Sequence, residues 1–129
     1  MPELWDYKSK TGITSTSQTT VATDLKVPPG VRRIKGYWTF IKGTIETGKE
    51  QWGIFELSGA GIANRSPLKL PATSSTGIGN VGTAASQEYV QQLKVIPCDI
   101  PVNPGYDIII KVTLIDDQST DVYFGVIFE

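Results

Sequence analysis

The stretch DLKVPPG at residues 24–30 returns later in the chain as DIPVNPG at residues 99–105. Each copy leads into an alternating apolar run, and the two runs end in related phrases, WGIFE at residues 52–56 and FGVIFE at residues 124–129. Both copies have the pattern of strand, Pro-Gly turn, strand, turn and strand. A unit of roughly thirty residues cannot cover its own apolar face, so two copies are predicted to close on one another as a sandwich.

Two explanations of this repeated pattern stay open. In the first, residues 24–56 and 99–129 are an internal duplication. In the second, the copies share only turn chemistry, because Pro and Gly are the usual turn residues. Both explanations predict strands, and the rest of the chain agrees, since it is rich in Thr, Ile, Val and Gly and alternates at period two.

The predicted fold is all-β. Strands are expected at residues 4–8, 19–27, 31–47, 51–57, 87–95, 97–102, 106–115 and 122–128. About eight strands at this spacing predict one antiparallel β-sandwich domain over residues 1–129, with jelly-roll or related Greek-key wiring.

In the long strand at residues 31–47, even-numbered side chains are expected to point inward, because successive side chains leave opposite faces of a strand. This places Trp38 in the core and Tyr37 on the outer face beside Arg33 and Lys35. An aromatic ring beside two cations is suited to stacking on a nucleic-acid strand. The chain has no basic excess, however, so a nucleic-acid partner is disfavoured.

A connection of 29 residues, 58–86, lies between the two copies. Its only charged residues are Arg65 and Lys69, and it is crowded with Gly, Ala, Ser and Thr. Disordered segments usually carry charge, so we predict an ordered arm or interface loop, in which residues 67–71 form a short edge strand between prolines. The apolar contact residues assigned to this arm are Leu68, Leu70 and Ile78.

Two strands carry apolar side chains on both faces. In the last strand, Tyr123 and Ile127 lie opposite the core-facing set, and Ile109 and Ile115 do the same in the preceding strand. A strand that buries only one face should be polar on the other. The additional apolar side chains on the outer face predict that either the connecting loop or a neighbouring subunit covers them.

Charge is balanced overall, with 12 basic and 13 acidic residues, but it is unevenly distributed. Residues 24–49 hold six basic residues and two acids, a net charge of +4, whereas residues 99–129 hold six acids and one lysine, a net charge of −5. This asymmetry predicts a head-to-tail contact between subunits, and the alternative is neutralisation between strands of one chain. The side chains assigned to the contact are Arg32, Arg33, Lys35, Asp107, Asp116, Asp117 and Asp121.

Composition excludes most catalytic chemistry. The chain has no histidine for a His-based triad, and its one cysteine, Cys98, cannot form a thiolate zinc cage. GIGNVG at residues 77–82 matches a dinucleotide-binding pattern, but it lies in a Ser/Thr-rich loop. We therefore predict a protein that is not an enzyme and holds no cofactor.

Two binding sites compete with ordinary structural roles. Asp116, Asp117 and Asp121 offer the oxygen ligands that Ca²⁺ prefers, although an acidic hairpin turn is the commoner meaning, so no metal site is predicted. A sugar-binding platform is the other candidate, although strand aromatics are more often core. Its residues would come from Trp5, Tyr7, Tyr89 and Tyr123.

No stretch of eighteen apolar residues occurs, so no transmembrane helix and no membrane contact are predicted. Residues 1–6 lack the basic and apolar regions of a signal peptide. The chain is expected to be made in the cytoplasm, with a virion as the candidate destination.

In strand number and turn spacing, the predicted architecture resembles single jelly-roll coat proteins, fibre heads and carbohydrate-binding modules. Fold alone does not fix function. We predict a non-catalytic structural module that self-assembles as a homo-oligomer, most concretely in a virion capsid or fibre or another protein shell, and the alternative is a carbohydrate-binding β-sandwich. The predicted interface residues are Arg32, Arg33, Lys35, Tyr37, Leu68, Leu70, Ile78, Asp116, Asp117, Tyr123 and Ile127.

Overall fold

A computed structural model describes residues 3–45, 48–62, 68–73, 76–79, 87–90 and 95–129 of the chain. The described residues form strands and no helix. In chain order the strands are β1 (Leu4–Ile13), β2 (Thr19–Lys26), β3 (Arg33–Ile45), β4 (Trp52–Gly59), β5 (Leu68–Thr73), β6 (Thr76–Gly79), β7 (Gln87–Val90), β8 (Ile96–Pro101), β9 (Asp107–Leu114) and β10 (Thr120–Phe128).

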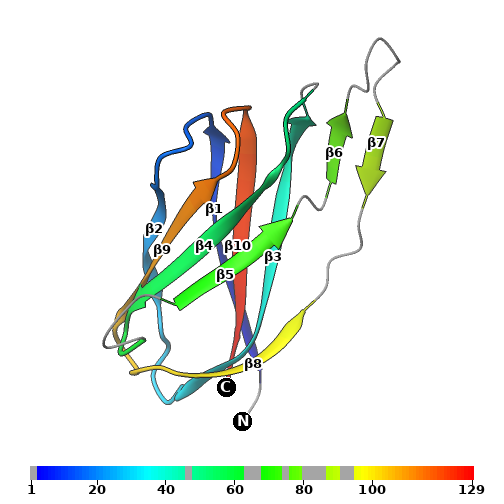
Figure 1. The fold of residues 1–129 in the computed structure, drawn as a ribbon. Helices are drawn as coiled ribbons and strands as arrows, with labels where there is room; N and C mark the ends of the chain where they lie inside the picture. The colour runs from blue at the N-terminus through cyan, green and yellow to red at the C-terminus, as the bar shows by residue number, and fades with distance from the viewer. Residues whose placement is uncertain (1–2, 46–47, 63–67, 74–75, 80–86, 91–94) are drawn as a thin grey trace.

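The strands make two sheets that pack face to face (Figure 1). The first has the order β1-β10-β3, with β8 paired to one end of β3 and the β6–β7 hairpin to the other. The second has the order β2-β9-β4-β5. Among the described strands the pairings are antiparallel, apart from that of β3 with β6, which is parallel. The predicted all-β sandwich is confirmed.

The wiring is that of a jelly roll. β1 pairs with β10, β2 with β9, β3 with β8, and β4 with β5, so the chain follows one long hairpin that is wound into two sheets. The β6–β7 hairpin is an insertion between β5 and β8. The insertion begins within the predicted connection of residues 58–86 and extends beyond it to Val90, and β5 forms the edge strand predicted in that connection.

The two Pro-Gly turns have the same backbone conformation. Gly30 and Gly105 have φ angles of 82° and 83°, values that favour glycine. The Val31 amide donates to the carbonyl of the residue three positions earlier at 3.2 Å, and the Tyr106 amide does the same at 3.5 Å. The turns also touch, since the Gly105 amide donates to the Val27 carbonyl at 2.8 Å.

Strands β2–β3–β4 and β8–β9–β10 hold corresponding places in this wiring. Each series crosses from one sheet to the other at its Pro-Gly turn and then crosses back. Common turn chemistry and an internal duplication both fit this arrangement. The duplication of residues 24–56 and 99–129 therefore stays a prediction.

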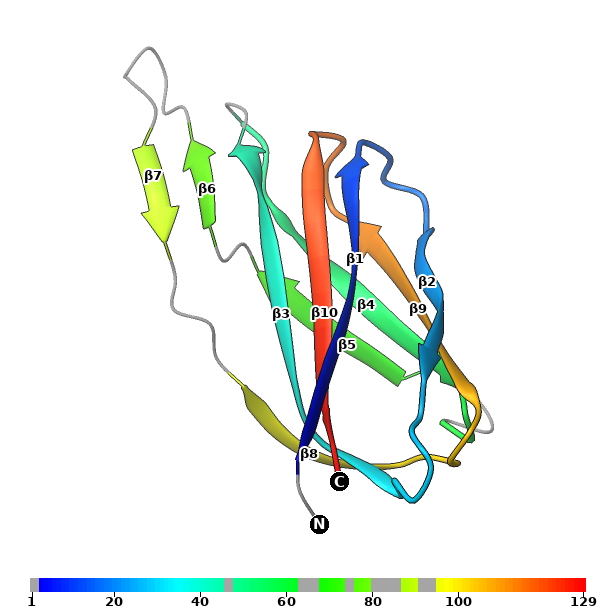
Figure 2. The same ribbon diagram turned by 180° about the vertical axis from the view of Figure 1, so that it is seen from behind.

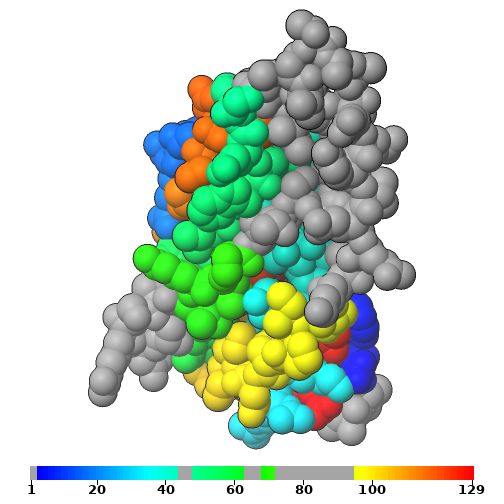
Figure 3. Space-filling model, turned by 45° about the vertical axis from the view of Figure 1, so that its right-hand side comes forward, coloured from blue at the N-terminus to red at the C-terminus, as the bar shows by residue number. Residues whose placement is uncertain are grey.

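The core lies between the sheets and is centred on phenylalanine. The rings of Phe55 and Phe124, from opposite sheets, have centroids 5.1 Å apart, and Tyr37 stacks on Phe124 at 5.9 Å with an interplanar angle of 8°. Leu68 and Leu70 of β5 are partly buried against this core. On the side seen in Figure 3, β5 and β8 cover neighbouring parts of the surface.

The predicted faces of β3 are wrong beyond Lys35. Ile34 pairs with Phe128, but Gly36 pairs with Ile127, so β3 carries one extra residue at this point. Such a bulge exchanges the inward and outward positions of the residues that follow it. Odd-numbered residues of β3 then face the core, including Tyr37, which is 8% exposed.

Replacing Gly105 by alanine is expected to lower the free energy of unfolding by about 1–2 kcal/mol, because a side chain is unfavourable in this left-handed conformation. A Cβ there would meet no atom within 4 Å, so the loss comes from the backbone alone. Urea unfolding measures the change. The matched control is Gly105→Asn, which should lose less because asparagine adopts this conformation more readily. Equal losses for the two variants would contradict a backbone origin.

Candidate interaction surface

An aromatic patch covers the outer face of the β1-β10-β3 sheet, the face that Figure 2 views from the front. It follows from the strand register. Tyr7 and Trp38 pair with Gly125 from either side, and Ser9 and Phe40 flank Tyr123 in the next row. We define the aromatic patch as Trp5, Tyr7, Trp38, Phe40 and Tyr123.

A glycine allows Trp38 to lie close against the sheet. A Cβ built on Gly125 would come within 1.9 Å of the Trp38 ring, so the indole occupies the place of the missing side chain. Trp38 Nε1 is buried there, and no residue in the described part of the chain forms a hydrogen bond with it. The Tyr7 ring lies beside the indole, with centroids 5.9 Å apart and an angle of 40° between the planes.

A second aromatic pair extends the patch toward the end of β3. Phe40 meets Tyr123 edge to face, with centroids 5.7 Å apart and planes at 73°. Lys42 Nζ lies 5.8 Å from the centroid of the Tyr123 ring, within the range of a cation–π contact. The Tyr123 ring therefore has both an apolar and a cationic neighbour.

The patch is open where β1 contributes to it. Trp5 is 57% exposed and Tyr7 is 55% exposed. Ile127, in the same face, is instead 3% exposed, because its Cδ1 and the Val95 Cγ1 both lie over Gly36. Its own chain covers Ile127, so this predicted interface residue has little exposed surface to offer a partner.

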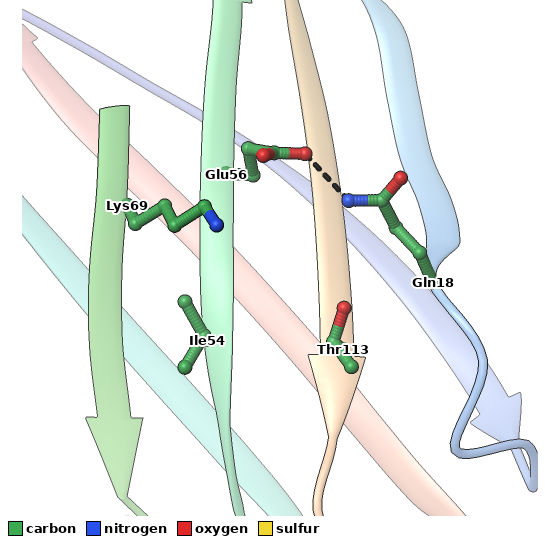
Figure 4. Close-up of a pocket in the computed structure, with 5 residues that line it drawn as sticks. All are labelled: Gln18, Ile54, Glu56, Lys69 and Thr113. Carbon is green, nitrogen blue, oxygen red and sulfur yellow. Dashed lines mark hydrogen bonds between the residues drawn. The ribbon is translucent and has the colours of Figure 1, made fainter. Parts of the chain in front are cut away.

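The outer face of the other sheet has a different character. A hollow of about 220 Å³ there is lined by one apolar side chain, Ile54, and four polar ones (Figure 4). Gln18 Nε2 donates a hydrogen bond of 2.5 Å to Glu56 Oε2, and Lys69 and Thr113 complete the lining. The two outer faces of the sandwich therefore differ, one being aromatic and the other mixed and charged.

The basic residues assigned to a subunit contact have partners within the chain. Arg33 pairs with Glu129, and it lies 3.7 Å from the Asp99 carboxylate. Lys35 pairs with Glu3, and its Nζ lies 3.4 Å from Glu129. The hydrogen bonds from Arg33 and then Lys35 hold the pKa of Glu129 below its ordinary value. This geometry fits the alternative of neutralisation within one chain, while Arg32 is exposed.

The three aspartates of the turn between β9 and β10 and the start of β10 each bind a different partner. The Asp116 carboxylate accepts a hydrogen bond of 2.6 Å from the Glu50 amide, and Asp117 pairs with Lys49 at 2.5 Å. The Asp121 carboxylate accepts one of 2.9 Å from the Gly12 amide, at the end of β1. Among the residues that the structure describes, no group of three His, Cys, Asp or Glu side chains is placed to hold a metal ion.

Several other predicted site residues lie elsewhere. Tyr37 is in the core, so it cannot stack on a base or contact a partner. Ile78 is in β6 and Tyr89 is in β7, away from the aromatic patch along the sheet. Cys98 is half-buried, and burial raises the pKa of its thiol.

Sequence reasoning missed Trp38 and Phe40, the residues that complete the patch with Trp5, Tyr7 and Tyr123. A signal was present, because residues 37–41 of β3 carry large apolar side chains on both faces. That pattern indicates that the outer face also packs against something.

Comparisons with protein-family models, with curated proteins and with solved structures find no significant match to this chain. Across the described ranges, no helix has the length and hydropathy needed to cross a membrane.

Gly125→Ala is expected to destabilise the fold by about 1–3 kcal/mol, because the new methyl group overlaps the Trp38 ring. In a Trp38→Ser background the same substitution should cost much less. Urea unfolding of both single variants and the double variant gives the coupling energy between the two positions. Additive losses would show that the indole does not occupy the space above Gly125.

Glu129→Gln is expected to flatten the acid side of the stability–pH profile. The folded pKa of Glu129 lies below its ordinary value of 4.5, so its contribution is fully present above that pH and is lost as the pH falls through the folded pKa. The parent chain should therefore lose stability more steeply than the variant below pH 4.5. Thermal melts from pH 7 to pH 2.5 measure this, and parallel profiles would rule out the ion pairs as the cause.

Proposed function

We propose that this protein is a non-catalytic structural module that self-assembles, most concretely as a component of a virion or another protein shell. The observation that carries the proposal is the aromatic patch, which serves as the contact surface between copies. The jelly-roll wiring supports it, because capsid domains are among the main users of this architecture. Fold analogy alone would be insufficient.

The composition of the patch suits a protein contact. Tryptophan and tyrosine are enriched at the centres of protein interfaces, where each buries a large apolar area at a small cost in conformational entropy. Trp5 and Tyr7 are more than half exposed, and the Tyr7 ring adjoins the packed Trp38. A second copy that covers this surface would remove exposed apolar area from water.

The contrast between the two outer faces gives the module an orientation. The outer face of β4 and β9 carries Glu56 beside Lys111 in the strand register, and Lys69 of β5 pairs with Glu56 on the other side. A face with alternating charges of this kind is suited to contact with solvent. We infer that the aromatic patch is turned toward other copies and that the charged face is turned away from them.

The pairing of Arg33 and Lys35 within the chain changes the proposed role of charge. These cations already contact Glu129 and Glu3, so a head-to-tail contact through them would have to replace existing pairs. Exposed ion pairs are individually worth about 0–1 kcal/mol. Apolar contact at the patch is therefore the main driving force in this proposal.

A carbohydrate-binding module is the second candidate function, and one observation favours it. Trp38 lies low over Gly125 beside Tyr7, which gives the sheet adjacent aromatic surfaces with an exposed margin. Neighbouring rings of this kind can pack against the apolar face of a sugar. Saturable quenching of tryptophan fluorescence by a neutral oligosaccharide, with a monomeric protein, would favour this candidate.

Tyr7→Glu is expected to weaken self-association at least about tenfold, because a contact typically buries on the order of 1,600 Å² and cannot easily bury an unpaired carboxylate. Light scattering after size exclusion, over a dilution series, measures the effect. The matched control is Ile54→Glu, which places the same charge on an exposed residue of the other sheet and should leave association unchanged. A parent chain that stays monomeric at high micromolar concentration would contradict the proposal, as would equal effects of the two variants.

A further inference from the structure

Strand β1 contributes almost nothing to the core. Of its ten residues, Ile13 alone is buried, and Lys8 is half-buried. By contrast, seven of the nine residues of its neighbour β10 are buried. The strand on the outside of this pair therefore adds little to the burial that holds the sandwich together.

The reason lies in the side chains that β1 turns toward the inside. Lys8 pairs with Phe124 and Lys10 pairs with Val122, both of which are core residues of β10. At the open side of the sandwich these inward positions of β1 are charged, and Lys8 Nζ lies 3.3 Å from Asp24 of β2. Inward-pointing charges on an edge strand oppose unspecific edge-to-edge pairing.

Backbone pairing holds β1 in place, together with the Tyr7–Trp38 ring contact and the Lys8–Asp24 ion pair. It pairs with β10 from Leu4 to Lys10 and again at Ile13, and among the described strands β10 is its only partner in the sheet. If β1 left, β10 would keep its pairing with β3 and its buried side chains, but it would expose a row of unpaired amides and carbonyls. The strand that fits this exposed edge of β10 best is β1 itself.

The connection that follows β1 is suited to act as a hinge. Residues 14–18 are all exposed, and the register of β1 shifts between Lys10 and Ile13. Gly12 within this shift has a φ of 68°, a conformation that glycine adopts without strain. The strand therefore ends in an exposed segment, which is held at its two ends by the hydrogen bonds Gly12–Asp121 and Gln18–Glu56.

We propose that β1 exchanges between two copies of this chain, so that β1 of one copy pairs with β10 of the other; the inference rests on the proposed self-assembly and specifies its mechanism. Exchange remakes every contact that it breaks, because the incoming strand is identical. The low burial of β1 keeps the cost of its release small. Trp5 and Tyr7 then complete the aromatic patch of the partner copy.

Two single-cysteine variants test the exchange in the full chain. Both carry Cys98→Ser, and one adds Ser9→Cys while the other adds Tyr123→Cys, positions that lie directly opposite each other in the β1–β10 register. The two are unfolded, mixed in equal amounts, refolded together and oxidised. Exchange is expected to give the mixed disulfide in excess of the two homodisulfides, and mass spectrometry separates these three dimers, each of about twice the chain mass of 14.0 kDa, because the two variants differ in mass.

A chain carrying both cysteines is the control, because its disulfide shows that the geometry permits the bond. If this control oxidises and no mixed disulfide forms, the exchange is overturned. If the control itself fails to oxidise, the pair Lys10→Cys and Val122→Cys gives the same readout with a second register pair. Light scattering of the Cys98→Ser parent separates the two ideas: an oligomer without the mixed disulfide refutes the exchange alone, whereas a monomer without it refutes the exchange and the proposed self-assembly together.

Discussion

The contact between Phe124 of β10 and Phe55 of β4 joins the two sheets at their centre, and the other features of the molecule are arranged around it. Because Phe124 points inward, its neighbours Tyr123 and Gly125 must point outward. Gly125 then leaves the space that Trp38 fills. The same alternation of side chains thus builds the apolar core on one face of β10 and the aromatic patch on the other. A substitution at the centre of the core that shifts β10 would therefore also shift the aromatic patch on the outer surface.

The sequence predicted the sandwich well because period-two alternation and Pro-Gly turns act locally. The faces of β3 could not be predicted in the same way, because a single extra residue at Lys35 reverses the alternation, and that residue is defined by its pairing with β10. Tyr37 was assigned to the surface and Trp38 to the core for this reason. The aromatic patch depends on register between strands that are distant in the chain. Trp5 and Tyr7 were recognised as candidates, but their neighbour Trp38 is identified by its pairing opposite Gly125.

The pattern of charge shows a similar limit. A net charge of +4 in one segment and −5 in another looks like polarity of the whole molecule. Jelly-roll wiring brings these segments together, since β3 lies between β8 and β10, and the start of β4 lies near the hairpin before β10. Arg33, Lys35 and Lys49 then meet acids across those strands. Charges that are separated along the sequence therefore largely neutralise one another in the folded chain. The aromatic patch is the clearer sign of a contact surface.

The nested pairing of the jelly roll also sets an order in time. Strand β1 pairs with β10, Leu4 opposite Phe128, so β1 has no partner until synthesis has passed Phe128. At typical rates of synthesis, about 5–20 residues per second, that delay is roughly 6–25 s. During it β1 is an unpaired segment with two exposed aromatic rings. Several ribosomes can translate one messenger RNA at the same time. The first β10 edge that an unpaired β1 meets can then belong to a neighbouring copy whose β10 was synthesised earlier.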